Sequence, residues 1–209
     1  MGRDVEEDHE RRTPLQAVLL ADSFTTRFKP ITLEKPKVLL PVCGVPLIDY
    51  TLEWLESSGV EAIYVFCCAH SDKVVEHLRQ KWGISSEDED AKDRYGAKIV
   101  PIVSTNCMSA GEALRFIYDE GVINSDFILI TGDTVTSINL QNVLRAHNAR
   151  RKSDKSSIMT MVVKKASTRA ERKRLGDADL IVQTDPKTKQ LINYEKGKTK
   201  GVIKLDLPS

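Results

Sequence analysis

Short runs of apolar residues alternate along the chain with longer segments whose apolar positions recur every three or four residues. Runs that are apolar throughout are typical of strands buried on both faces. The second pattern is typical of helices with one inward-facing stripe. Strands are therefore expected at residues 15–21, 62–68, 98–103, 126–131 and 157–163. Helices are expected at residues 47–56, 72–82, 109–120 and 140–151, with Ser71 as the N-cap of the second one.

This alternation predicts an α/β fold with a doubly wound, Rossmann-like and mostly parallel sheet. Right-handed crossovers place helices on both faces of such a sheet. Its ligands bind beyond the carboxyl ends of the strands. The loops that follow Ala21 and Thr131 are therefore the places where we expect a functional site.

Outside the alternating region the sequence predicts less regular structure. Residues 1–14 are expected to form a flexible charged tail, and residues 15–209 are assigned to one α/β domain. Within that domain, residues 85–94 form an acidic insertion with almost nothing apolar to bury. Two apolar runs flank the turn-forming sequence DPKTK, which predicts a β-hairpin over residues 180–194.

Composition limits the classes of partner and the compartment. The chain has 209 residues and a formal net charge of +1, so it has no bulk attraction to nucleic acid or to an anionic membrane. Its apolar runs are too short to cross a bilayer. The four cysteines, Cys43, Cys67, Cys68 and Cys107, form no C-x-x-C pair and are expected to be reduced thiols in a cytosolic protein.

Prolines, threonines and basic residues between the first expected strand and the first expected helix form the clearest motif. Its parts are Thr26-Arg27, Pro30-Ile31-Thr32, Pro36-Lys37, Pro41-Val42 and Pro46. In order and spacing they resemble the opening signature of the sugar-phosphate nucleotidyltransferases. Gly132-Asp133 resembles the Gly-Asp pair of the same family. The resemblance implies a sheet of the nucleotidyltransferase type that is C-terminally truncated in this chain.

In that family a sugar-phosphate oxygen attacks the α-phosphate of a nucleoside triphosphate, and pyrophosphate leaves. Backbone N–H groups of a glycine-rich loop hold the phosphates, because glycine has no side chain to obstruct a close approach. The carboxylate of the Gly-Asp pair holds Mg²⁺, which neutralises developing charge. In this chain the loop reads Ala21-Asp22-Ser23-Phe24-Thr25-Thr26-Arg27, so its glycines are absent.

The changed loop predicts that phosphate binding is lost. Asp22 would place a carboxylate beside the phosphate oxygens, which costs about 4 kcal/mol for two charges ~4 Å apart near a protein surface. Phe24 adds bulk at the same place. We therefore interpret this region as a degenerate phosphate site with no catalytic residue and no cofactor. Its positions are Ala21, Asp22, Phe24, Arg27 and Lys37.

Two questions about the retained polar residues stay open at this point. Asp133 is either a vestigial metal ligand or a polar residue that caps the turn after its strand. Arg27 and Lys37 either bind an anion or have surface roles.

A narrower resemblance rests on the loop sequence ADSF and on the segments around it. The matching segments are Leu15–Phe24, Pro36–Pro41, Leu47–Leu55, Val65–Cys68 and Ser125–Asp133. They resemble the N-terminal region of the epsilon subunits of eukaryotic translation initiation factor 2B. The resemblance implies a non-catalytic scaffold in a guanine nucleotide exchange factor whose exchange domain lies elsewhere.

The same resemblance implies partners and a compartment. The expected partners are the gamma and other subunits of the exchange factor and GDP-bound initiation factor 2, with no direct contact to nucleic acid or membrane. The expected compartment is the cytosol. Two alternatives are an active sugar-phosphate nucleotidyltransferase and a catalytically dead regulatory subunit of one.

Overall fold

The computed structural model of the protein describes residues 14–22, 28–84, 96–163 and 180–196. The charged tail, except for its last residue, and the acidic segment at residues 85–94 lie outside the described residues. The chain forms two compact units, Met1–Asn148 and Ala149–Ser209. The assignment of residues 15–209 to a single domain therefore stays a prediction.

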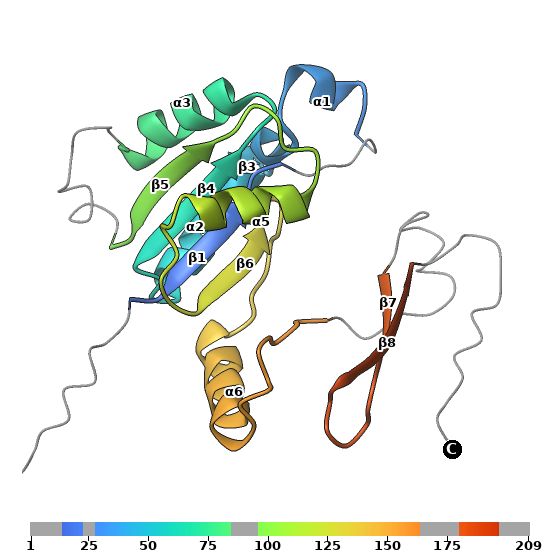
Figure 1. Cartoon of the computed structure of the whole chain (residues 1–209). Helices are drawn as coiled ribbons and strands as arrows, with labels where there is room; N and C mark the ends of the chain where they lie inside the picture. The colour runs from blue at the N-terminus through green and yellow to red at the C-terminus, as the bar shows by residue number, and fades with distance from the viewer. Residues whose placement is uncertain (1–13, 23–27, 85–95, 164–179, 197–209) are drawn as a thin grey trace, which may run out of the picture. The chain divides into compact units, whose positions relative to one another are not determined.

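A four-stranded parallel sheet forms the centre of the first unit (Figure 1). Its strands are β1 (Gln16–Leu20), β4 (Ala62–Cys67), β5 (Lys98–Val103) and β6 (Phe127–Thr131). They lie in the order β5-β4-β1-β6, and each neighbouring pair runs parallel. The chain thus extends the sheet from β1 through β4 to β5 and then returns to the other side of β1 with β6. This order confirms the doubly wound fold that the sequence predicts.

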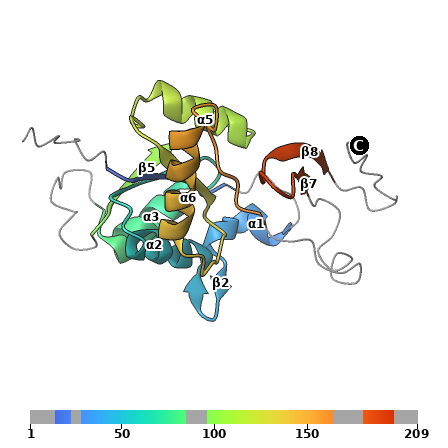
Figure 2. The same ribbon diagram turned by 90° about the horizontal axis from the view of Figure 1, so that it is seen from below.

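Helices cover both faces of the sheet. Figure 2 shows α5 (Ala110–Asp119) on one side, with α2 (Leu47–Ser57) and α3 (Ser71–Trp82) on the other. A fourth helix, α6 (Leu140–Ser153), follows β6 in the chain. Because both faces are covered, β1 is buried at all five of its positions. This is the reason that β1 is apolar almost throughout instead of alternating with polar residues.

The core consists of two clusters, one on each face of the sheet. Ala17 and Leu19 of β1 pack in the cluster that α2 and α3 cover. Val18 and Leu20 pack with Phe66 in the cluster that α5 covers. Full burial of one such leucine contributes about 1.5–3 kcal/mol. The two clusters hold β1 rigidly, and so they fix where its carboxyl end lies.

Short elements that the hydrophobic pattern does not predict lie between β1 and α2. They are α1 (Ile31–Glu34), the 3₁₀ helix η1 (Lys37–Leu39), β2 (Pro41–Val42) and β3 (Val45–Pro46). The side chains of Val38 and Leu39 are buried in the core. They anchor η1 and therefore the position of Lys37.

Two local predictions are wrong. Ser71 is the first residue of α3, and the N-cap is His70, whose φ of 54° is left-handed and whose side chain caps no N–H group. No strand forms at residues 157–163, although the segment is described and rich in β-branched residues. High β-propensity describes how a side chain fits a sheet, and a strand also needs a hydrogen-bonded neighbour. Within the described part of the chain, this segment has none.

The second unit contains an antiparallel pair of strands, β7 (Leu180–Thr184) and β8 (Leu191–Lys196), at the place where the sequence predicts a hairpin. The Asp185 carboxylate stabilises the connecting turn by accepting hydrogen bonds from the N–H groups of Lys187 (2.7 Å) and Thr188 (2.6 Å). Lys189 adopts a left-handed φ of 62° at the end of this turn. Asp-Pro sequences favour such turns because the aspartate side chain can accept hydrogen bonds from these backbone N–H groups.

Candidate functional site

The carboxyl ends of β1 and β6 meet where the strand order of the sheet reverses. Ala21 and Asp22 follow β1, and Gly132 and Asp133 follow β6. The Gly132 N–H donates to the carbonyl of Leu20 at 2.9 Å, so the two segments lie directly side by side. Ligands of doubly wound sheets bind at such a reversal point. The structure therefore brings together two of the segments that carry the family motif.

Gly132 permits this close approach. A Cβ atom at this position would lie 2.8 Å from Cδ2 of Leu19 and 3.1 Å from Cγ1 of Val38. Contacts below 3.0 Å between carbon atoms are repulsive, so a side chain would push the loop away from β1. The glycine of the Gly-Asp pair is thus explained by packing, without reference to a ligand.

Helix α2 holds the loop after β6 from the other side. The buried Thr51 hydroxyl donates to the carbonyl of Thr134 at 2.8 Å. Trp54 Nε1 donates to the carbonyl of Ile138 at 3.0 Å. These bonds satisfy backbone carbonyls that no strand pairs, and they fix the loop that carries Asp133.

Lys37 and Asp133 form an ion pair and a hydrogen bond between Nζ and Oδ2. Their side chains are only 20% and 17% exposed, so water screens the pair weakly. The Lys37 ammonium also lies 4.9 Å from the centre of the Phe28 ring, within the range of a cation–π interaction. Lys37 is therefore held in place from two sides by groups of the protein itself.

The charge state of Asp133 follows from this environment. Partial burial acts to raise the pKa of its carboxyl, but hydrogen bonds from Lys37 and Thr131 and the Lys37 charge outweigh it. The pKa of Asp133 is therefore lowered from its ordinary value of 3.8. Asp133 is a carboxylate at neutral pH, and Lys37 compensates its charge.

The Asp22 carboxylate also bonds to the protein. Its Oδ2 accepts a hydrogen bond from the backbone N–H of Cys68, and the N–H of Ala69 contributes a second bond. Burial raises the pKa of Asp22 above 3.8, while these two amides and the nearby His70 act in the opposite direction. Backbone N–H groups at a loop before a helix are typical partners of a phosphate. Here they hold a carboxylate of the same chain.

Of the remaining positions of the degenerate phosphate site, only Ala21 is among the described residues. Ala21 is buried, and its N–H donates to the carbonyl of Phe66 at 2.9 Å. Phe24 and Arg27 lie outside the described residues. Ala21, Asp22 and Lys37 thus belong to the described part of the carboxyl edge.

The described residues form no cage of protein ligands for Mg²⁺, the metal that the family resemblance implies. Mg²⁺ requires oxygen ligands in near-octahedral geometry. No group of three or more His, Cys, Asp or Glu side chains in residues 14–22, 28–84, 96–163 and 180–196 could hold a metal. Asp133 offers one carboxylate, and its Oδ2 already bonds the Lys37 ammonium.

A buried cluster around Asp49 was not predicted from the sequence. Asp49 of α2 is fully buried, and its Oδ1 accepts from Trp82 Nε1 and contacts His77 Nε2, both at 2.9 Å. Lys81 forms an ion pair with Oδ2 at 3.1 Å. Asp49 lies beside the apolar stripe of its helix, which is the one signal that could have indicated burial. The cluster braces α2 against α3.

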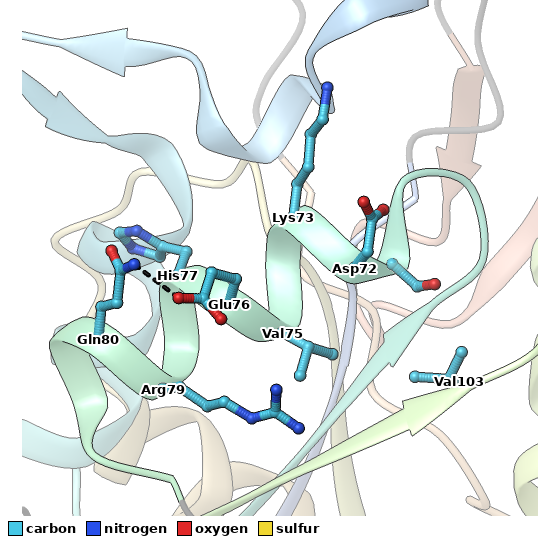
Figure 3. A pocket seen from close by; sticks show the side chains of 9 residues that line it. Asp72, Lys73, Val75, Glu76, His77, Arg79, Gln80 and Val103 are labelled. Atoms are coloured by element: carbon cyan, nitrogen blue, oxygen red, sulfur yellow. Dashed lines mark hydrogen bonds between the residues drawn. The ribbon is translucent and has the colours of Figure 1, made fainter.

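A surface hollow also lies along α3. It is lined by residues of α3 between Ser71 and Gln80 together with Val103 of β5 (Figure 3). Within it, Gln80 Nε2 donates to Oε1 of Glu76 at 2.6 Å. Neither Asp22, Lys37 nor Asp133 lines it, so it is not the site that the motif indicates.

The reversed strand order and the loops at the ends of β1 and β6 define an α/β domain of the nucleotidyltransferase type. A family model described as "Nucleotidyl transferase" matches residues 16–169, and the chain belongs to this family. A crystal structure of HddC from Yersinia pseudotuberculosis complexed with GMP-PN has the same fold. Its TM-score is 0.57 at 18% identity, over 88% of this chain and 70% of that one.

The curated relatives are more specific. Translation initiation factor eIF2B subunit epsilon of Dictyostelium discoideum is 45% identical over 187 residues, 89% of this chain and 25% of that protein. The protein of the same name in Schizosaccharomyces pombe is 42% identical over 188 residues, 88% of this chain and 26% of that protein. The resemblance to the epsilon subunits is thus confirmed. The chain spans about a quarter of the length of these relatives.

The described helices also bear on membrane association. None of those in residues 14–22, 28–84, 96–163 and 180–196 combines the length and the apolar character that a bilayer span requires.

Proposed function

We propose that this chain is a non-catalytic scaffold region of an epsilon subunit of translation initiation factor 2B, the guanine nucleotide exchange factor for initiation factor 2. The identity of 45% and 42% to two such subunits, over nearly nine tenths of the chain, supports the assignment. One observation carries the non-catalytic part of the proposal. The polar groups of the carboxyl edge bond to one another, as Lys37 does to Asp133 and the Cys68 N–H to Asp22.

These internal bonds oppose the binding of a nucleoside triphosphate. Its phosphates would have to take Lys37 from Asp133 and approach the Asp22 carboxylate. Two like charges ~4 Å apart repel by about 4 kcal/mol near a protein surface. A loss of even ~3 kcal/mol weakens binding on the order of a hundredfold. Ala21, Asp22, Phe24, Arg27 and Lys37 are, in this proposal, the remnant of a phosphate loop. Asp133 is either a vestigial metal ligand or a polar residue that caps the turn after β6.

The proposal includes the partners and the compartment. The chain pairs with the gamma subunit and contributes to the assembled exchange factor, which acts on GDP-bound initiation factor 2 in the cytosol. It makes no direct contact with nucleic acid or membrane. In this proposal the exchange reaction belongs to a part of the longer relatives outside the quarter of their length that this chain matches.

A second candidate function is sugar-phosphate nucleotidyl transfer. The observation in its favour is that Lys37 and Asp133, the retained cation and carboxylate of the family motif, meet at the carboxyl edge. In that reading the same two side chains would separate to receive phosphate and metal. A dead regulatory subunit of such an enzyme would share the site but bind a different partner.

Two measurements separate these functions. The first is pyrophosphate release by the purified chain with Mg²⁺, each nucleoside triphosphate and a panel of sugar phosphates. We expect none above background, and turnover that disappears in Asp133→Asn would overturn the non-catalytic assignment. The second is affinity purification of the tagged protein from its own cells. Recovery of initiation factor subunits is expected, whereas recovery of a pyrophosphorylase would identify the regulatory alternative.

A further inference from the structure

The four cysteines of the chain occupy different environments. Cys67, the last residue of β4, is 1% exposed and packs in the cluster beneath α2 and α3. Cys68 follows it and is half-buried on the opposite face, against the cluster beneath α5. Successive residues of a strand point to opposite faces, which explains the separation. Cys43 is exposed in the turn between β2 and β3.

Cys107 lies beside Cys68. The Cys68 thiol donates to the carbonyl of Cys107, with Sγ 3.4 Å from the oxygen. The Cys107 Sγ lies 3.4 Å from the Ser104 hydroxyl, and both cysteines pack against the same cluster. The carboxyl end of β4 and the loop between β5 and α5 thus bring two half-buried thiols together. Cys68 Sγ thus already lies against the main chain of Cys107, and a disulfide between the two residues would join the sulfurs at about 2.05 Å.

We propose that Cys68 and Cys107 are a redox modification site and form a reversible disulfide when the protein meets a peroxide. One thiolate attacks a peroxide oxygen, so an S–O bond forms, the O–O bond breaks and water leaves after protonation. The second thiol attacks the resulting sulfenic sulfur, the S–S bond forms and a second water leaves. Two thiols and one hydrogen peroxide give one disulfide and two waters. A dithiol reductant reverses the change.

The surroundings favour this pair over the others. Burial raises the pKa of Cys67 to about 12, with smaller contributions from Asp22 and Cys68, so its reactive thiolate is scarce. Burial also raises the pKa of Cys68, so its thiolate is less abundant and its reaction with peroxide is slow. The neighbouring Cys107 is then needed to trap the sulfenic acid as a disulfide. Cys43 has no second thiol in its turn. Disulfides in reducing compartments are usually transient and sensory.

A disulfide between Cys68 and Cys107 would restrain the candidate site. The Cys68 N–H donates to Asp22, so a disulfide at Cys68 ties the loop after β5 to the residue that replaces the phosphate-binding glycines. The inference does not depend on the proposed function, because it concerns thiol chemistry that any role of the domain would leave in place.

Peptide mapping tests the proposal. The folded chain is treated with hydrogen peroxide, free thiols are blocked with N-ethylmaleimide, and a non-reducing tryptic digest is analysed by tandem mass spectrometry. Trypsin leaves Cys43, Cys67 and Cys68 on the peptide Val38–Lys73 and Cys107 on Ile99–Arg115. We expect these peptides to be joined through Cys68, with dithiothreitol separating them. Cleavage after Phe66 by chymotrypsin then removes Cys43 from the assignment.

Matched variants make the result decisive. Cys43→Ser removes the exposed thiol and should leave the linked peptides unchanged. Cys68→Ser and Cys107→Ser should each abolish them, and circular dichroism establishes that each variant is folded. A link that persists in Cys68→Ser, a Cys67–Cys68 bond, or peroxide products confined to Cys43 would overturn the proposal. A Cys107→Ala variant replaces Cys107→Ser if the latter does not fold.

Discussion

The Lys37 ammonium and the Asp133 carboxylate are hydrogen-bonded to each other although 96 positions separate them in the chain. Each comes from a short segment fixed by a larger one. Val38 and Leu39 bury η1 beside β1, and Gly132 lets the loop after β6 lie against Leu19. The ion pair thus depends on the packing of β1 and not only on the two charges. Removal of this ion pair therefore tests how the carboxyl edge of the sheet is stabilised.

Replacement of Lys37 by methionine keeps most of the apolar stem and removes the charge. Asp133 then loses its strongest partner while it remains largely buried, and we expect the free energy of unfolding to fall by about 1–2 kcal/mol. Urea denaturation followed by circular dichroism measures this change. Lys35→Met is the matched control, because Lys35 is exposed nearby, and it should stay within about 0.5 kcal/mol of the wild type. Equal effects of the two variants would mean that the ion pair contributes nothing.

The same pair predicts a dependence on acid. The pKa of Asp133 is lower in the folded protein than its ordinary 3.8, so its contribution is fully present above that value. It is lost as the pH falls through the folded-state pKa. The difference in unfolding free energy between wild type and Lys37→Met should therefore shrink below about pH 4. Urea titrations in a series of acidic buffers measure it. Other carboxylates titrate in both proteins, so a difference that stays constant with pH would contradict the assignment.

Asp22 provides a prediction of a different kind. Asp22→Ala leaves the Cys68 and Ala69 N–H groups without an acceptor, at a cost of about 1–3 kcal/mol. Asp22→Asn keeps an acceptor oxygen and removes the negative charge. Burial disfavours that charge, as the raised pKa of Asp22 indicates. We therefore expect Asp22→Asn to be at least as stable as the wild type at neutral pH. Hydrogen exchange at Cys68 and Ala69 should accelerate in Asp22→Ala alone.

The acid dependence of Asp22 has the opposite sign to that of Asp133. A carboxyl whose folded pKa is raised above 3.8 binds its proton earlier in the folded state, so it stabilises the protein as the pH falls toward that value. Asp22→Asn should lack this increment. If Asp22→Asn and Asp22→Ala lose the same stability, the carboxylate does not act by accepting the amides.

The hydrophobic pattern predicted the sheet well because continuous apolar runs report burial on both faces, as at β1 and β4. It also predicted that the loops after β1 and β6 lie together, since parallel strands end at one edge, and the structure has this arrangement. It did not predict that Asp22 bonds Cys68, because the partner belongs to another strand and no periodicity relates the two. Asp49 was missed for a similar reason, since its partners His77 and Trp82 lie on the neighbouring helix. The strand predicted at residues 157–163 does not form because local propensity cannot supply a neighbouring strand.

Gly132→Ala tests whether the site depends on a close backbone approach. The new methyl group would lie 2.8 Å from Leu19 Cδ2 and 3.1 Å from Val38 Cγ1, in a core that cannot yield freely. Overpacking of this kind costs about 1–3 kcal/mol, which urea denaturation measures. Gly111→Ala is the control, because Gly111 lies in α5 and its Cβ would meet nothing closer than Ser109 Oγ at 4.0 Å. Alanine favours a helix, so this variant should gain up to about 1 kcal/mol. The two glycine-to-alanine substitutions should therefore change the free energy of unfolding in opposite directions. If Gly132→Ala leaves it unchanged, the loop moves freely away from β1 and packing does not explain this glycine.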